Sequence, residues 1–66
     1  MLSFEEGMAR FIRGWRRYHC VTQEELAEHL GVTRKTVSLW ETGNHPPPDM
    51  LGLALETLGK KLRGDP

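Results

Sequence analysis

The side chains best suited to binding chemistry stand close together near the middle of the chain. Arg34 and Lys35 are cationic, and Thr36 and Ser38 carry hydroxyl groups. Thr36 falls at the third position of a predicted helix, where a glutamate would complete the cap. Because no carboxylate stands there, the positive end of this helix is open to an anion such as phosphate.

Groups for catalysis are not gathered in this way. The sequence has no nucleophile grouped with a base and an orienting acid, and no glycine-rich phosphate loop. Its single cysteine, Cys20, has no second thiol, and His19 and His29 do not complete a metal-ligand set with it. We therefore expect no enzymatic activity, metal, cofactor or small-molecule ligand.

Two short helices must position the binding side chains. The first starts with a capping box, in which Thr22 caps the free amides and Glu25 reaches back. Val21 and Leu26 have the spacing of a hydrophobic staple. Gly31 supplies the left-handed residue that ends this helix.

The second helix of the pair starts with Thr33 as its cap and closes at Gly43. Val32 and Val37 have staple spacing, and Val37 and Trp40 share the inward face. The positions left facing outward are Arg34, Lys35, Ser38 and Leu39.

Three motifs within residues 22–43 carry a family resemblance: T-Q-E-E-L-A, L-G-V-T and T-V-S-x-W-E-x-G. They resemble the helix-turn-helix of the phage repressor/Cro (XRE-type) family of DNA-binding proteins, with Ala27 where the two helices cross. The likeness extends more loosely over residues 8–58. It implies an all-α, lambda-repressor-like fold of four helices, or five, in one compact domain over residues 1–66 with a basic tail at 60–66.

The resemblance also implies which residues touch DNA. In that family the second helix of the pair enters the major groove with its N-terminal end leading. Arg34 or Lys35 would then hydrogen-bond guanine, and the Ser38 hydroxyl would hydrogen-bond either type of base. Leu39 would contact a thymine methyl or be an ordinary exposed leucine. The expected phosphate contacts are Thr22, Gln23, Thr33, Thr36 and Asn44.

A structural ion pair between Arg16 and Glu41 is a further implication of the resemblance. An arginine fork matches a carboxylate at two points, so this pair would hold the reading helix at its angle. The other arginines of the first helix, Arg10, Arg13 and Arg17, share a second face. They are either solvated surface or contacts to the DNA backbone.

The composition of the chain limits the number of domains, the kind of partner and the expected compartment. The 66 residues make one domain at most, and nine basic and nine acidic residues give a formal net charge of zero. Neutrality argues mildly against nucleic-acid binding, but the charges alternate in blocks, so one face can be basic. The chain has no apolar run for a membrane span and no signal-peptide pattern, and one cysteine suits a reducing cytosol, so we expect a cytoplasmic protein.

The flanking segments complete the predicted domain. A first helix is predicted from about Phe4 to His19, capped by Ser3. Its predicted core residues are Phe4, Met8, Phe11, Ile12 and Trp15. Cys20 follows where the family prefers glycine, so we expect a different turn there. In the later proline-rich loop, His45 touches phosphate or is merely part of a turn.

The last helix is predicted to start at Pro48 and to stop at Gly59. Its apolar positions spread over about 200° of the helix surface, wider than the usual stripe of about 100°. We expect the surplus to form a homodimer contact, unless the tail residue Leu62 folds over it. The expected dimer residues are Met50, Leu53 and Thr57.

One such domain buries too little surface for tight specific binding. We therefore expect a homodimer on a palindromic double-stranded operator, with half-sites about 34–36 Å apart. Comparison with the family suggests an autoregulating repressor, as found in phage, anti-CRISPR-associated and toxin–antitoxin operons. The alternative is an antitoxin, or another phage or host protein-interaction module, because fold does not fix function.

Overall fold

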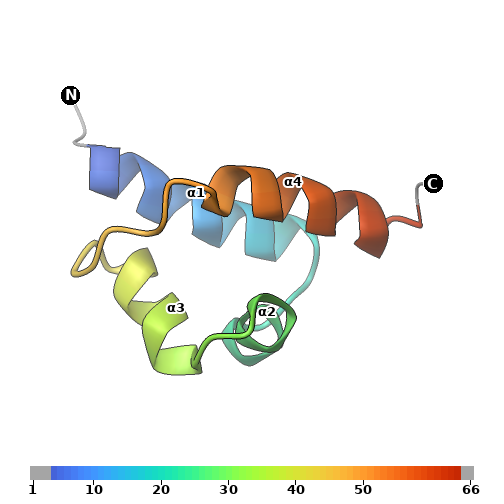
Figure 1. The fold of residues 1–66 in the computed structure, drawn as a ribbon, viewed down its shortest axis with the longest axis horizontal. Helices are drawn as coiled ribbons and strands as arrows, with labels where there is room; N and C mark the ends of the chain where they lie inside the picture. Colours follow the sequence, from blue (N-terminus) through green and yellow to red (C-terminus); the bar gives the residue numbers. More distant parts are fainter. Residues whose placement is uncertain (1–3, 65–66) are drawn as a thin grey trace.

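The computed structural model describes the backbone of residues 4–64 and the side chains of residues 7–64. Four α-helices follow in order: α1 (Phe4–Tyr18), α2 (Gln23–Leu30), α3 (Arg34–Glu41) and α4 (Leu51–Leu62). Figure 1 shows α1 and α4 along one side of the molecule, with α2 and α3 beneath them. The predicted all-α fold is confirmed. The proposed cap Ser3 and the side chain of Phe4 lie outside the described part.

The ends of α2 form as the sequence predicts. Thr22 Oγ1 accepts a hydrogen bond from the Glu25 amide at 3.1 Å, and Glu25 Oε1 accepts one from the Thr22 amide at 3.0 Å. Gly31 takes the left-handed conformation with φ of 73°, and the Val32 amide donates to the Ala27 carbonyl at 3.0 Å. An eight-residue helix is marginal alone, so these end bonds help to define it.

The ends of α3 are fixed in the same manner. Thr33 Oγ1 accepts from the Thr36 amide at 3.2 Å. At the other end Gly43 has φ of 78°, and the Asn44 amide donates back to the Leu39 carbonyl at 3.0 Å. The predicted cap at Thr33 and the predicted end at Gly43 are confirmed.

The core takes one fully buried side chain from each helix. Ile12, Leu26, Val37 and Leu55 are each 0% exposed. Trp40 of α3 packs beside them, and Ala27 is buried as expected for the small residue of α2. α3 packs against both α1 and α2, so its orientation is set by the rest of the domain.

The turn after α1 differs from our expectation. Cys20 adopts the left-handed conformation itself, with φ of 55°. The Val21 amide donates to the Arg16 carbonyl at 2.9 Å and the Cys20 amide to the Arg17 carbonyl at 3.2 Å, the bonds of a glycine-type helix end. The prediction of a different turn was therefore wrong, and Cys20 carries the conformational strain that a glycine would avoid.

Both predicted ends of α4 were wrong. The helix starts at Leu51, because Pro48 instead forms a turn in which its carbonyl accepts from the Leu51 amide at 3.0 Å. Gly59 lies inside the helix and is buried. A Cβ at this position would lie 3.1 Å from His19 Nε2, so the glycine permits close packing of α4 on α1. The residue with positive φ beyond the helix end is Gly64, at 78°.

The exposure of several apolar residues also corrects the prediction. Phe11 was assigned to the core but is 47% exposed, because it lies on the flank of α1 beside the buried Ile12. Leu62 is the last residue of α4 and is 40% exposed, so it does not fold over the helix as the alternative required. Within the described range, none of the helices has the length and apolar character needed to cross a membrane.

Candidate nucleic-acid interface

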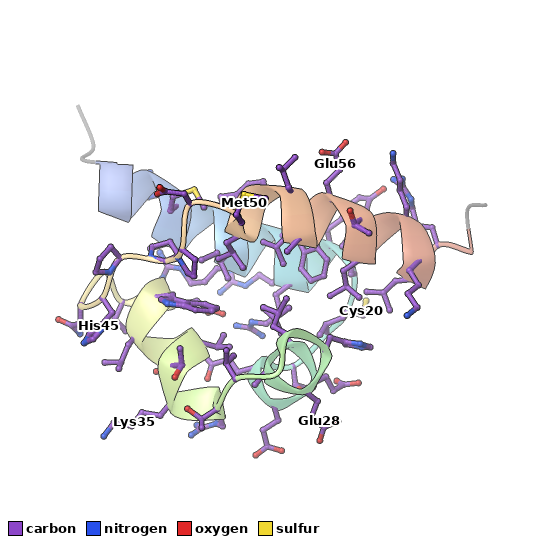
Figure 2. The ribbon with its side chains drawn as sticks, in the orientation of Figure 1. Cys20, Glu28, Lys35, His45, Met50 and Glu56 are labelled. Carbon is purple, nitrogen blue, oxygen red and sulfur yellow. The ribbon has the colours of Figure 1, made fainter. Side chains whose placement is uncertain are left out.

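The outward face of α3 carries the side chains that the sequence singled out for base contacts. Arg34 and Lys35 are exposed, and Ser38 and Leu39 are half-buried. Figure 2 shows Lys35 pointing away from α1 and α4. The first turn of α3 contains no acidic residue, so its positive end is not neutralised by its own helix.

A polar depression of about 400 Å³ opens between the starts of α2 and α3. Its lining residues are Arg16, Thr22, Gln23, Glu24 and Arg34. The structure thus brings Arg34, expected at a base, beside two residues expected at phosphate. Glu24 is the one acidic member of the lining and opposes an anion, whereas the two arginines and the helix start favour one.

Glu41 bonds two residues that line this depression, Arg16 and Gln23, and thereby joins three helices. It accepts from Arg16 Nε at 2.9 Å and from Arg16 Nη2 at 3.0 Å. Its Oε1 also accepts from Gln23 Nε2 at 3.4 Å. The Glu41 side chain is 3% exposed and that of Arg16 is 20% exposed. The contact to Gln23 was missed by sequence reasoning, because the two residues lie 18 positions apart.

Two side chains around the interface, Arg16 and Glu25, have shifted pKa values. The hydrogen bond to Glu41 raises the pKa of the Arg16 guanidinium, and the opposite charge adds to this against the effect of burial. Hydrogen bonds from Thr22 lower the pKa of the Glu25 carboxyl. Both shifts favour the charged forms, so Arg16 is cationic and Glu25 is anionic in the folded protein at neutral pH.

The remaining candidate phosphate contacts already have partners within the protein. The hydroxyl groups of Thr33 and Thr36 are 2.9 Å apart, and Asn44 Nδ2 donates to Thr42 Oγ1 at 2.8 Å. His45 is exposed, and its amide donates to the Leu39 carbonyl at 3.3 Å, so it belongs to the turn that ends α3. Whether these groups also meet phosphate stays a prediction.

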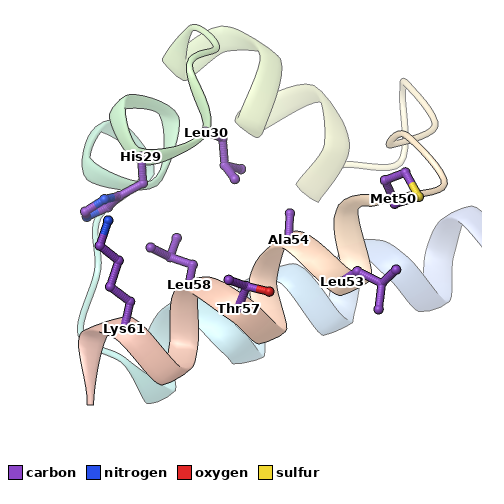
Figure 3. Close-up of a pocket in the computed structure, with 8 residues that line it drawn as sticks. All are labelled: His29, Leu30, Met50, Leu53, Ala54, Thr57, Leu58 and Lys61. Carbon is purple, nitrogen blue, oxygen red and sulfur yellow. The ribbon is translucent and has the colours of Figure 1, made fainter. Parts of the chain in front are cut away.

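The candidate dimer residues lie on another surface. Met50 is 65% exposed, Leu53 is 58% exposed and Thr57 is exposed. All three line a shallow depression of about 450 Å³, together with His29, Leu30 and Lys61. Figure 3 shows Lys61 reaching toward His29 across this depression, while Leu53 points away from α2. The surplus apolar surface predicted for α4 is therefore present.

Comparison with known proteins agrees with this geometry. A family model described as helix-turn-helix matches residues 21–64, most of the chain. The chain belongs to the XRE-type helix-turn-helix family. The matched residues include α2, the turn after it and α3.

One curated relative of this helix-turn-helix domain is an uncharacterized HTH-type transcriptional regulator from Methanothermobacter thermautotrophicus. The two are 48% identical over 40 residues, which cover 61% of this chain and 58% of the relative. The chain therefore spans little more than half of the relative's length. No solved structure matches the chain.

Proposed function

We propose that the protein is a DNA-binding transcriptional regulator that reads double-stranded DNA with α3. The observation that carries this proposal is the exposed start of α3, where Arg34 and Lys35 stand free of acidic neighbours in their own turn. A helix presented in this way fits the major groove, where arginine and lysine bond guanine O6 and N7. Ser38 and Leu39 follow on the same face and are the further base contacts.

The start of α2 supplies the main phosphate contact in this proposal. Gln23 is the first residue of α2 and has one amide hydrogen directed at Glu41, which leaves the other for a phosphate oxygen. The free amides of the first helical turn point the same way. Thr22, Thr33, Thr36 and Asn44 add contacts that set register but carry little sequence information.

The proposed working form is a homodimer on a palindromic operator. A single domain of this size contacts too few base pairs for tight specific binding. Met50, just before α4, and Leu53 of α4 are exposed and supply the apolar contact, with Thr57 beside them. Binding over a promoter would block polymerase, so the protein would act as a repressor, and as an autorepressor at its own operon, in the cytoplasm of a bacterial or phage-infected cell.

A selection of random DNA duplexes with the full chain tests the proposal. We expect enrichment of a twofold-symmetric sequence, and a log of the binding constant that falls with log salt by about 0.9 per neutralised phosphate. Sedimentation of the chain with and without Leu53→Ser tests the dimer. Enrichment of no sequence at low salt would overturn DNA reading.

Two observations favour the protein-interaction alternative. The net charge is zero and the α4 surface around Leu53 is apolar, which suits a protein partner better than a polyanion. A dimer that ignores every duplex at low salt and instead captures a host or toxin protein through Leu53 would select this alternative.

A further inference from the structure

A further groove, separate from the two depressions described above, runs between α1 and α4. It has a volume of about 380 Å³, and its lining includes Phe11, Gly14, Trp15, Tyr18, Leu55 and Glu56. In Figure 2, Glu56 points to the side of the molecule opposite Lys35. The groove therefore lies away from the face of α3 to which DNA binding is assigned.

Two exposed aromatic side chains form the α1 wall of this groove. Phe11 is 47% exposed and Tyr18 is 74% exposed, and they stand seven residues apart on one helix face. The Tyr18 ring meets His19 edge-on with centroids 5.0 Å apart, and His19 lies 4.5 Å from Trp15. Trp15 is itself fixed by a 3.1 Å hydrogen bond from Nε1 to the Leu55 carbonyl. These contacts order Trp15, Tyr18 and His19 in advance, which lowers the entropy lost on binding.

The surface of α1 is open at Gly14. Gly14 lies between Phe11 and Tyr18 on the same side of α1, and a Cβ built there meets no atom within 4 Å. Glycine weakens the interior of a helix relative to alanine, and no packing within the domain requires it here. A side chain from another molecule can therefore rest on the backbone of α1 between Phe11 and Tyr18.

Charge identifies the kind of partner. Arg10 and Arg17 are exposed and repeat the same seven-residue spacing beside the aromatic pair. Among residues 7–64, neither arginine forms an ion pair. The charged residues that line the groove are Glu56 and Arg63, so with Arg10 and Arg17 beside it, arginines outnumber carboxylates around the groove. A second copy of the chain is disfavoured, because twofold pairing of α1 with its copy would oppose arginine to arginine.

We propose that this groove binds an acidic amphipathic helix of a partner protein. A seven-residue repeat advances about 10.5 Å along a helix, which matches two apolar turns of another helix lying alongside. The partner's apolar side chains would pack on Phe11, Gly14 and Tyr18, and its carboxylates would pair with Arg10 and Arg17. The surface is separate from α3, so the partner can bind the protein on DNA.

Selection of displayed 16-residue peptides on the full chain tests this proposal. We expect enriched peptides to carry apolar residues at helical spacing flanked by aspartate or glutamate. Their affinity should fall at least tenfold for Phe11→Ser with Tyr18→Ser, and tenfold for Arg10→Glu with Arg17→Glu. The matched control, Leu62→Ser, removes an exposed apolar side chain of α4 that does not line the groove, and it should bind these peptides like the unchanged chain.

The outcomes separate this proposal from the DNA proposal. The Phe11→Ser, Tyr18→Ser variant should keep its DNA affinity while losing the peptides. Failure to enrich any peptide that depends on these two aromatics would overturn the groove assignment. Two further results would also overturn it: loss of self-association in that variant, which would assign the face to a second copy, or loss of DNA affinity, which would assign it to duplex binding.

Discussion

Arg16 of α1 and Glu41 of α3 form a two-point ion pair, with Nε to Oε2 at 2.9 Å and Nη2 to Oε1 at 3.0 Å. Arg16 also donates from Nη1 to the Val21 carbonyl at 3.3 Å. The pair therefore links α1, the turn after it and α3. Through its bond to Gln23, the same carboxylate reaches the start of α2.

Glu41→Ala should lower the free energy of unfolding by about 2–4 kcal/mol, because it leaves the Arg16 guanidinium without its buried partner. Urea denaturation at low temperature measures this. Replacing both partners, as Arg16→Met with Glu41→Leu, should cost less than Glu41→Ala alone, since no unpaired charge remains. If Glu41→Ala were as stable as the unchanged chain, the pair would have no architectural role.

Cys20→Gly should raise the free energy of unfolding by up to about 1 kcal/mol. Glycine removes the left-handed strain of about 1–2 kcal/mol, and the greater freedom of the unfolded chain offsets part of that gain. Thermal unfolding followed by circular dichroism is the measurement. Cys20→Ser removes the thiol but keeps a Cβ, so it should leave stability near its starting value. A gain in the serine variant would point to the thiol rather than to the backbone.

Gly59→Ala and Gly52→Ala should change the free energy of unfolding by different amounts, although both residues lie within α4. At Gly52 a Cβ meets nothing within 4 Å, so alanine should stabilise the helix by about 1 kcal/mol. At Gly59 the new Cβ would press on His19 Nε2 at 3.1 Å and on Trp15 Nε1 at 3.4 Å, which offsets that gain. Denaturant midpoints and tryptophan fluorescence report the difference. Equal stabilisation at both positions would show that α1 and α4 are less closely packed than the structure indicates.

Acid should weaken the start of α2 through Glu25. Its pKa is lowered in the folded protein by hydrogen bonds from Thr22, so the unfolded chain binds the proton more readily. The stabilisation is present above the unfolded pKa of about 4.3 and is lost as pH falls through the lower folded value. Unfolding temperatures between pH 7 and 3 should therefore drop more for the unchanged chain than for Glu25→Gln. Glu28→Gln, in the same helix but outside the cap, is the control, and parallel curves for all three chains would contradict the capping assignment.

Arg34→Ala and Gln23→Ala should weaken DNA binding in different ways. Loss of Arg34 should reduce discrimination at one base pair by about 1–3 kcal/mol. Loss of Gln23 should lower the affinity for all DNA sequences alike, because a phosphate contact carries little sequence information. Competition between the selected duplex and a scrambled one separates the two effects. An Arg34→Ala variant that keeps full sequence preference would show that the assumed register of α3 in the groove is wrong.

Much of the local structure follows from the sequence alone. The caps at Thr22 and Thr33 and the turns at Gly31 and Gly43 depend on bonds between residues a few positions apart, so the types and spacing of those residues determine them. Cys20 is the exception among these turns. The backbone bonds of the helix end held the left-handed conformation there despite the wrong residue type.

The arrangement around α4 was decided only by the tertiary structure. Gly59 was predicted to end the helix. Its role is instead to leave room for His19, which lies 40 positions away in the sequence. Phe11 had core spacing, yet the direction from which α4 packs leaves it half-exposed. The joining of Gln23 to Glu41 likewise needs α2 and α3 to be placed first. Local hydrogen bonds are encoded by neighbours in the chain, whereas burial and close approach depend on residues that only folding brings together.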